Sequence, residues 1–151
     1  MFKRILCPID LAKLSAAALE ITSVLAEQNH ATVSLVHVVQ SPLPRPLEPV
    51  PDWERTVKIR LGRLARKHLG DQARWDTLIL RGDPAQAIMQ AADELAADLI
   101  VMATHGHKGI NRLLLGSVAE RVVRESPIPV LTVRAGGQSA VNRTRQAIRS
   151  D

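Results

Sequence analysis

The stretch THGHKGINRLLLGS, residues 104–117, gathers the residue types in this chain that are best suited to binding chemistry. It holds three glycines, two histidines, one lysine and one arginine. Gly116 and Ser117 come directly before a helical pattern, and the free N–H groups and dipole of a helix start favour an anion. Lys108 and Arg112 would add positive charge. The stretch therefore predicts a phosphate site, with a purely structural turn and helix cap as the alternative.

Other site chemistries fit this loop poorly. It matches neither GxxxxGK[ST] nor GxGxxG, and the chain has no GxSxG nucleophile elbow. His105 and His107 have no cysteine or carboxylate cluster beside them, whereas a structural zinc needs four protein ligands. We therefore expect no catalytic residue and no metal site built by the protein alone.

The composition narrows the class of protein. A chain of 151 residues with 46% hydrophobic residues fits one globular domain. The net charge of +5 would suit a polyanionic partner. The basic residues are spread out, however, and aromatics make up only 2% of the chain, so the stacking platforms of nucleic-acid binders are missing. We expect no nucleic-acid binding.

The N-terminal segment indicates a soluble cytoplasmic protein. Cys7 is the single cysteine and sits in the apolar run ILCPI, which predicts a buried structural thiol. Asp10 interrupts the first apolar run before it reaches the length of a signal-peptide core. No apolar run approaches the roughly 18 residues of a membrane span, so we expect no membrane insertion.

Short apolar runs alternate with helical patterns along the chain. Strands are expected at 3–9, 32–39, 75–80, 98–104 and 129–133, and helices at 13–29, 52–69, 85–96 and 117–125. Pro84 behind Asp83 marks the start of the third helix. This alternation predicts an α/β fold, with a doubly wound, open, parallel five-stranded sheet of order 3-2-1-4-5 and helices on both faces. The loops after Ile9 and Ala103 should then face one another, where such folds bind ligands.

Several motifs together make this chain resemble the universal stress proteins. Their nucleotide-binding pattern is G-x2-G-x9-G-[ST], and Gly106, a nine-residue spacer and Gly116-Ser117 match its second part. GDPAQAI, RLLLGSVAERVV and PIPVLTVR also look like family segments, and the resemblance covers about residues 2–134. It implies a single domain at 1–134 with a Rossmann-like fold, like that of adenine nucleotide alpha hydrolases. The first glycine of the pattern falls on Ala103, which is a departure.

The resemblance implies an adenine nucleotide as ligand: ATP, or else AMP or ADP. Mg²⁺ bridging the bound phosphates would be the accompanying metal, because this ion keeps few protein ligands. Asp10 would bond the ribose hydroxyls, although an aspartate after a strand often only caps the next helix. Pro8, Ile9 and Val38 would meet the adenine, and Met102 and Ala103 would line the base and ribose. The phosphates would be held by Gly106, Gly116, Ser117 and Val118. The ten implied binding residues are Pro8, Ile9, Asp10, Val38, Met102, Ala103, Gly106, Gly116, Ser117 and Val118.

Two function classes follow, with a third held open. The first is a regulatory stress-response module whose ATP occupancy is sensed by a protein partner or by its own dimer. The second is a dimeric protein-interaction module of the same fold that has lost nucleotide binding, as the alanine at position 103 would allow. The third is an ATPase. Its hydrolysis would be slow, because the sequence offers no evident general base.

The chain's last segments suggest how it assembles. The fifth strand should lie at a sheet edge, where an apolar strand invites pairing with a second chain. Together with the family resemblance, this predicts a homodimer through Val130, Leu131, Thr132 and Val133. Residues 135–151 contain little apolar content and several arginines, which predicts a flexible basic extension.

Overall fold

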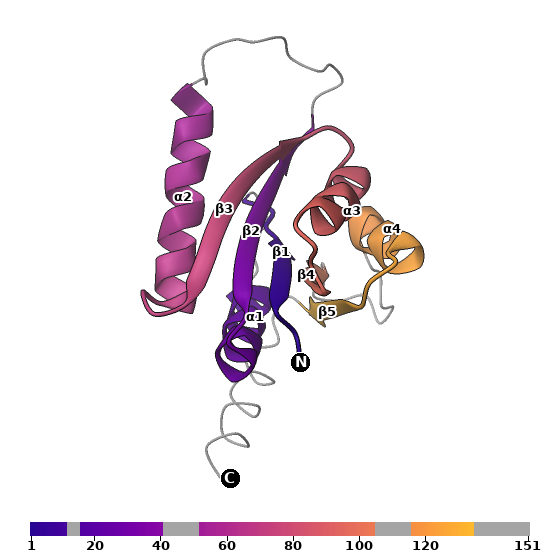
Figure 1. Cartoon of the computed structure of the whole chain (residues 1–151). Coiled ribbons are helices and arrows are strands. Elements are labelled where there is room, and N and C mark those ends of the chain that lie inside the picture. Colours follow the sequence, from indigo (N-terminus) through magenta and orange to yellow (C-terminus); the bar gives the residue numbers. More distant parts are fainter. Residues whose placement is uncertain (12–15, 41–51, 105–115, 135–151) are drawn as a thin grey trace.

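The computed structural model of this chain describes residues 1–11, 16–40, 52–104 and 116–134. Five parallel strands form one sheet in the order β3-β2-β1-β4-β5 (Figure 1), so the predicted fold class and strand order are confirmed. The strands are β1 (Arg4–Pro8), β2 (Thr32–Val39), β3 (Arg74–Arg81), β4 (Leu99–Thr104) and β5 (Val130–Arg134). The helices are α1 (Ala16–Asn29), α2 (Asp52–Leu69), α3 (Pro84–Glu94) and α4 (Ser117–Glu125).

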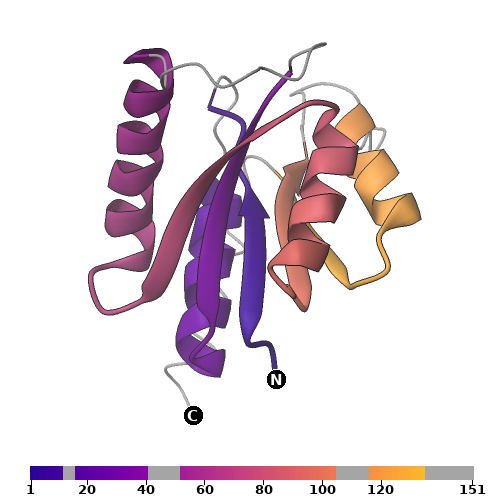
Figure 2. The same ribbon diagram turned by 45° about the horizontal axis from the view of Figure 1, so that its top comes forward.

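Helices cover both faces of the sheet (Figure 2). Leu19 of α1 and Leu61 of α2 belong to the core cluster on one face, and Val122 of α4 belongs to the cluster on the other face together with α3. Neighbouring residues of β4 alternate between these clusters, with Val101 on the first face and Met102 on the second. This double burial explains why β4 reads as an almost wholly apolar run.

Asp98 ties the beginning of β1 to the beginning of β4. Its carboxylate accepts hydrogen bonds from the backbone N–H groups of Lys3 at 2.7 Å and Arg4 at 3.1 Å. The sequence pattern placed Asp98 inside the fourth strand, whereas the strand begins at Leu99. The side chain thus links the amino ends of β1 and β4, the two strands whose carboxyl ends carry the candidate site.

The end of α3 differs from the sequence-based prediction. The helix was expected to continue to Ala96, but it ends at Glu94. Ala96 adopts φ 49°, and the N–H of Ala97 donates to the carbonyl of Ala92 at 2.8 Å. Such a left-handed closing residue is usually glycine, so an alanine there leaves no signal in the sequence.

Cys7 is fully buried in the core, as predicted for a structural thiol. Burial raises its pKa to about 12, although the hydroxyl of Thr22, 3.4 Å from Sγ, acts in the opposite direction. The thiol is therefore neutral at physiological pH, and the reactive thiolate is not populated.

Candidate functional site

The candidate site lies where β1 and β4 end side by side. The two strands pair in parallel, and α1 follows β1 on one face while α4 follows β4 on the other. Ligands of doubly wound sheets bind in the crevice outside the carboxyl ends of the strands, at the point where the strand order reverses. The order β3-β2-β1-β4-β5 places that point between β1 and β4.

A pocket of about 460 Å³ opens at this point. Its volume falls within the range of small-molecule sites. Nine of the ten residues singled out from the sequence line it, and the tenth, Gly106, lies outside the described residues. The nine are Pro8, Ile9, Asp10, Val38, Met102, Ala103, Gly116, Ser117 and Val118.

The first turn of α4 forms one wall of the pocket. Gly116 is the N-cap residue, and no side chain caps the helix start. The intrahelical hydrogen bonds begin with the N–H of Glu120, which donates to the carbonyl of Gly116 at 2.9 Å. The backbone N–H groups of Ser117 and Val118 belong to the set that a helix leaves without an internal acceptor. This wall therefore presents donors and the positive end of the helix dipole to an anion.

Gly116 does not need the conformational freedom of glycine. Its φ of −57° and ψ of 153° are accessible to any residue. The lack of a side chain at the pocket wall is the property of glycine that matters here.

Asp10 supplies the carboxylate of the pocket. It follows Ile9, whose N–H donates to the carbonyl of Val36 at 2.7 Å and so extends the pairing of β1 with β2 up to the pocket. Asp10 is exposed and lines the same pocket as Ser117 of α4, although the two residues are far apart in the sequence. One pocket thus combines a carboxylate with a helix start that favours anions, as a ligand with both hydroxyl and phosphate groups requires.

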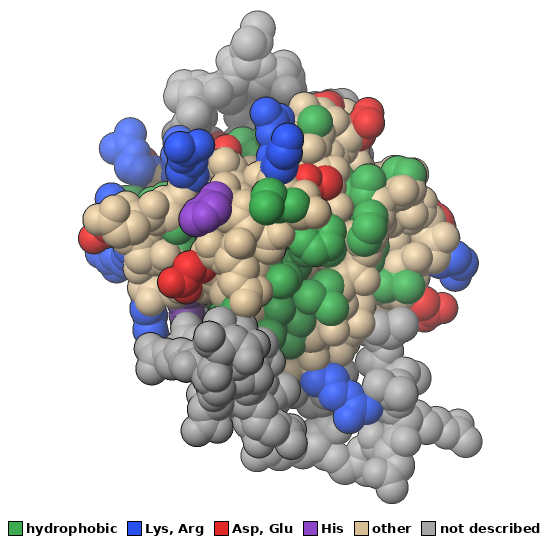
Figure 3. Space-filling view, turned by 60° about the horizontal axis from the view of Figure 1, so that its bottom comes forward, with side chains coloured by type: hydrophobic (Ala, Val, Ile, Leu, Met, Phe, Trp, Pro, Cys, Tyr) green, Lys and Arg blue, Asp and Glu red, His purple; other side chains and the backbone are tan. Residues whose placement is uncertain are grey.

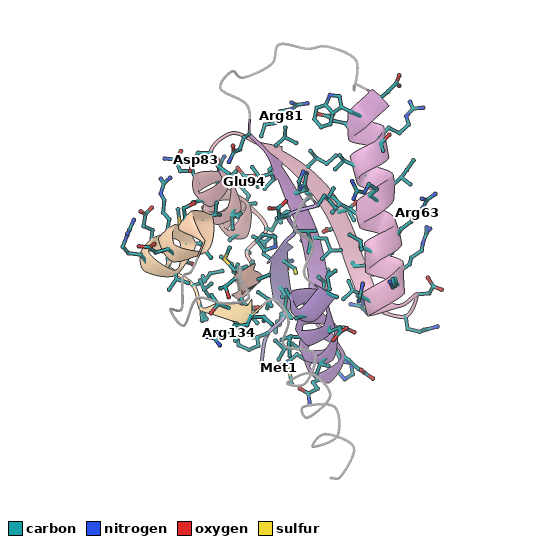
Figure 4. The ribbon with its side chains drawn as sticks, turned by 180° about the vertical axis from the view of Figure 1, so that it is seen from behind. Met1, Arg63, Arg81, Asp83, Glu94 and Arg134 are labelled. Carbon is teal, nitrogen blue, oxygen red and sulfur yellow. The ribbon has the colours of Figure 1, made fainter. Side chains whose placement is uncertain are left out.

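The helices α3 and α4 are joined beside the pocket by an ion pair. Asp83, labelled in Figure 4 at the start of α3, accepts a hydrogen bond from the N–H of Gln86 at 3.0 Å. The same carboxylate oxygen lies 2.8 Å from Nη1 of Arg121 in α4. Asp83 thus caps α3, as the sequence predicted, and also holds the second helix in place.

Comparison with known proteins agrees with this geometry. A family model described as the universal stress protein family matches residues 1–134. The chain belongs to this family. A universal stress protein of Thermus aquaticus is 38% identical over 145 residues, which cover 89% of this chain and 100% of that protein.

Solved universal stress proteins share the fold. One from Archaeoglobus fulgidus, in complex with dAMP, is 22% identical and has a TM-score of 0.65 over 86% of this chain and 96% of the other. Another, in complex with cAMP, is 20% identical and has a TM-score of 0.64 over 89% of this chain and 98% of the other.

His37 of β2 also lines the pocket of this universal stress protein. Its side chain is half-buried, and Nδ1 lies 2.8 Å from the carbonyl oxygen of Ile9. A carbonyl only accepts, so Nδ1 carries the proton and Nε2 is left as an acceptor in the neutral ring.

Six further lining residues were missed in the sequence. Gln40 directly follows β2, and Pro84 opens α3 directly after β3, so both stand at the carboxyl edge of the sheet. The rule that ligands bind at this edge would have found these two. The others are core side chains whose edges reach the pocket. The six are Ala18, Val36, Gln40, Pro84, Ile88 and Ala119.

The described part of this universal stress protein contains no cluster of three or more metal-ligating side chains. His105, His107, Lys108 and Arg112 lie outside the described residues. Within the same described ranges, no helix has both the length and the apolar character needed to cross a membrane.

Proposed function

We propose that this universal stress protein binds an adenine nucleotide, with ATP as the expected ligand, and acts as a regulatory stress-response module. The observation that carries the proposal is the convergence of nine predicted binding residues on one pocket. These residues come from β1, β2, β4 and α4, which are far apart in the chain. A structural turn and helix cap would not require such convergence.

The chemistry of the pocket walls suggests how the nucleotide would lie. Val38 and Met102, whose side chains pack on the α3 and α4 side of the sheet, offer an apolar surface for a flat base, and Ile9 lines the same pocket. Asp10 would accept hydrogen bonds from the ribose hydroxyls, and the start of α4 at Ser117 would hold the phosphates. The two complexes with dAMP and cAMP support this choice, because both ligands join an adenine to a phosphate.

Magnesium fits this site as an ion carried by the nucleotide. The described residues hold no ligand cluster of their own, and Asp10 is the one carboxylate among the residues that line the pocket. Mg²⁺ keeps several water ligands and is commonly bound through one carboxylate and substrate phosphates. When bound, the ion would neutralise phosphate charge.

Binding to a second protein without nucleotide is the competing function, and Ala103 is the observation that favours it. We place the protein in the cytoplasm, where ATP is abundant.

We propose slow or absent hydrolysis in either case, because the described part of the pocket offers no evident general base. Of the described pocket residues, only Asp10 and His37 are titratable, and the Nδ1 proton of His37 is engaged with the carbonyl of Ile9.

Mass spectrometry of the ligand that copurifies with the protein tests the proposal. The protein is purified without added nucleotide and denatured, and the supernatant is analysed for ATP, ADP and AMP. We expect a stoichiometric fraction of one of them. The absence of all three, together with no uptake after incubation with ATP and Mg²⁺, would leave the interaction module as the function.

We also propose a homodimer through β5. This strand pairs only with β4 among the described residues, and Leu131 is 38% exposed at that edge. Hydrophobic side chains gather on the lower face of the molecule, the side on which β5 lies (Figure 3). Antiparallel pairing about a two-fold axis would cover the unpaired backbone groups.

Sedimentation at tens of micromolar should give a dimer, and a Leu131→Lys variant should give a monomer. A monomer for the parent protein would refute the proposal.

A further inference from the structure

The outer side of α2 carries a row of positive charge, which we call the basic face. At about 100° per residue, its members fall within an arc of about 140° around the helix. The opposite side of α2 buries Leu61, Ala65 and Leu69 against the core. Figure 4 shows Arg63 on the outer side, pointing away from the sheet. The basic face consists of Arg55, Arg60, Arg63, Arg66 and Lys67, all exposed.

Interactions within the described residues do not balance this charge. None of the five cations forms an ion pair there, and Glu54, a carboxylate of α2, pairs instead with Arg81. Arg63 has like charges three residues before it and three and four residues after it, which destabilises a helix. The helix dipole favours cations only in the last turn. Repulsion among the like charges of the basic face therefore destabilises α2 in the isolated molecule, and an anionic partner would relieve it.

An apolar side chain stands in the middle of the basic face. Ile59 is 50% exposed and lies four residues from both Arg55 and Arg63. Trp53, at the start of the helix, is 38% exposed, with the guanidinium of Arg81 5.1 Å from its ring centroid. Helices that lie in a membrane interface combine cations with exposed apolar side chains in this way.

We propose that the basic face docks on the surface of an anionic membrane, with the cations on lipid phosphates and Ile59 in the interface. From Arg55 to Lys67 the face spans about 18 Å of one helix. The helix is already formed and packed on the core through Leu61, Ala65 and Leu69, so docking requires no new helix to fold. A nucleic acid would also attract the cations, but its phosphate backbone would offer no apolar contact to the exposed side chain of Ile59.

Cosedimentation of the full-length protein with vesicles tests this proposal. The vesicles contain phosphatidylcholine alone or phosphatidylcholine mixed with phosphatidylserine. We expect binding to the anionic vesicles only, weakening as salt is raised. Each cation near such a surface contributes about a fivefold factor, so Arg63→Gln with Lys67→Gln should lower the partition coefficient about thirtyfold. Ile59→Gln should cause a smaller loss that persists at higher salt.

The matched control removes the same net charge elsewhere. Lys3→Gln with Arg124→Gln changes exposed cations of the β1 start and of α4 and should lower the partition coefficient less than about threefold. Equal losses in the two double variants would show that overall charge, not α2, causes binding and would overturn the proposal. The proposal would also be overturned, in favour of a nucleic-acid partner, if the protein bound duplex DNA at a salt concentration at which it does not bind anionic vesicles.

Discussion

Ala103 stands where the family pattern has glycine, and the strand geometry indicates where its methyl group points. Ala103 pairs with Val133 in the register of β4 and β5, and Val133 packs against the core cluster that contains α1. Paired residues of neighbouring strands point to the same face of a sheet. The methyl group of Ala103 therefore points to the α1 face, whereas Gly116 and Ser117 start α4 on the other face.

We predict that Ala103→Gly leaves ATP affinity nearly unchanged. The dissociation constant should move less than about fivefold, because the methyl group points away from the helix start that would hold the phosphates. The free energy of unfolding should fall by about 0.5–1 kcal/mol, the cost of glycine in a strand. Calorimetry and urea denaturation measure the two effects. Tenfold tighter ATP binding by the variant would show that the methyl group crowds the ligand.

At the scale of elements, α3 and α4 form two walls of the pocket and are joined by one ion pair. Arg121 of α4 lies 2.8 Å from Asp83 and 3.3 Å from Glu125. The side chains of Arg121 and Asp83 are 33% and 44% exposed, so solvent weakens the attraction. We expect a coupling of about 0.5 kcal/mol, within the range of surface pairs.

A double-mutant cycle of Asp83→Asn and Arg121→Gln measures this coupling. Asparagine still accepts the hydrogen bond from the N–H of Gln86, so the cap of α3 is kept while the charge is removed. Urea denaturation of the four proteins gives the interaction energy. Glu125→Gln in the parent is the matched control for the other partner of Arg121. A cycle that closes to zero would show that apolar packing alone holds the two helices together.

The elements of this fold could be predicted where local signals and burial agree. β4 is apolar throughout because both its faces are covered, and α3 begins at Asp83-Pro84, a cap followed by proline. The end of α3 could not be predicted, because Ala96 adopts a left-handed conformation that is usually signalled by glycine. His37 could not be placed in the site from the sequence, because its apolar strand does not show that β2 reaches the pocket at this residue.

The candidate site was predictable as a set of residues but not as a shape. The family resemblance singled out the set, and the predicted strand order agreed with it for Asp10 and Ser117, which follow or begin an element at the carboxyl edge of the sheet. Side chains such as Ile88 reach the pocket only through the packing of α3 on the sheet, which no local pattern encodes. The loop at 105–115, where Gly106 falls, lies outside the described residues, so its role stays a prediction.

At the scale of the whole molecule, the sheet order separates three surfaces. The pocket lies at the carboxyl ends of the central strands, β5 forms one edge, and α2 packs along β3 at the other edge (Figure 1). A dimer through β5 would leave both pockets and both basic faces accessible. We therefore expect that substitutions can alter the proposed nucleotide binding, self-association and membrane docking one at a time.

The most direct test of the central claim is calorimetric titration of the purified protein with ATP, with and without Mg²⁺. We predict a dissociation constant in the micromolar range or tighter. Asp10→Ala should weaken binding about tenfold or more, because a charged acceptor for the ribose is lost. Gly116→Val should also weaken it, because a side chain would enter the pocket wall, whereas Asp71→Ala, far from the pocket, should not. No binding of ATP, ADP or AMP under either condition would contradict the account.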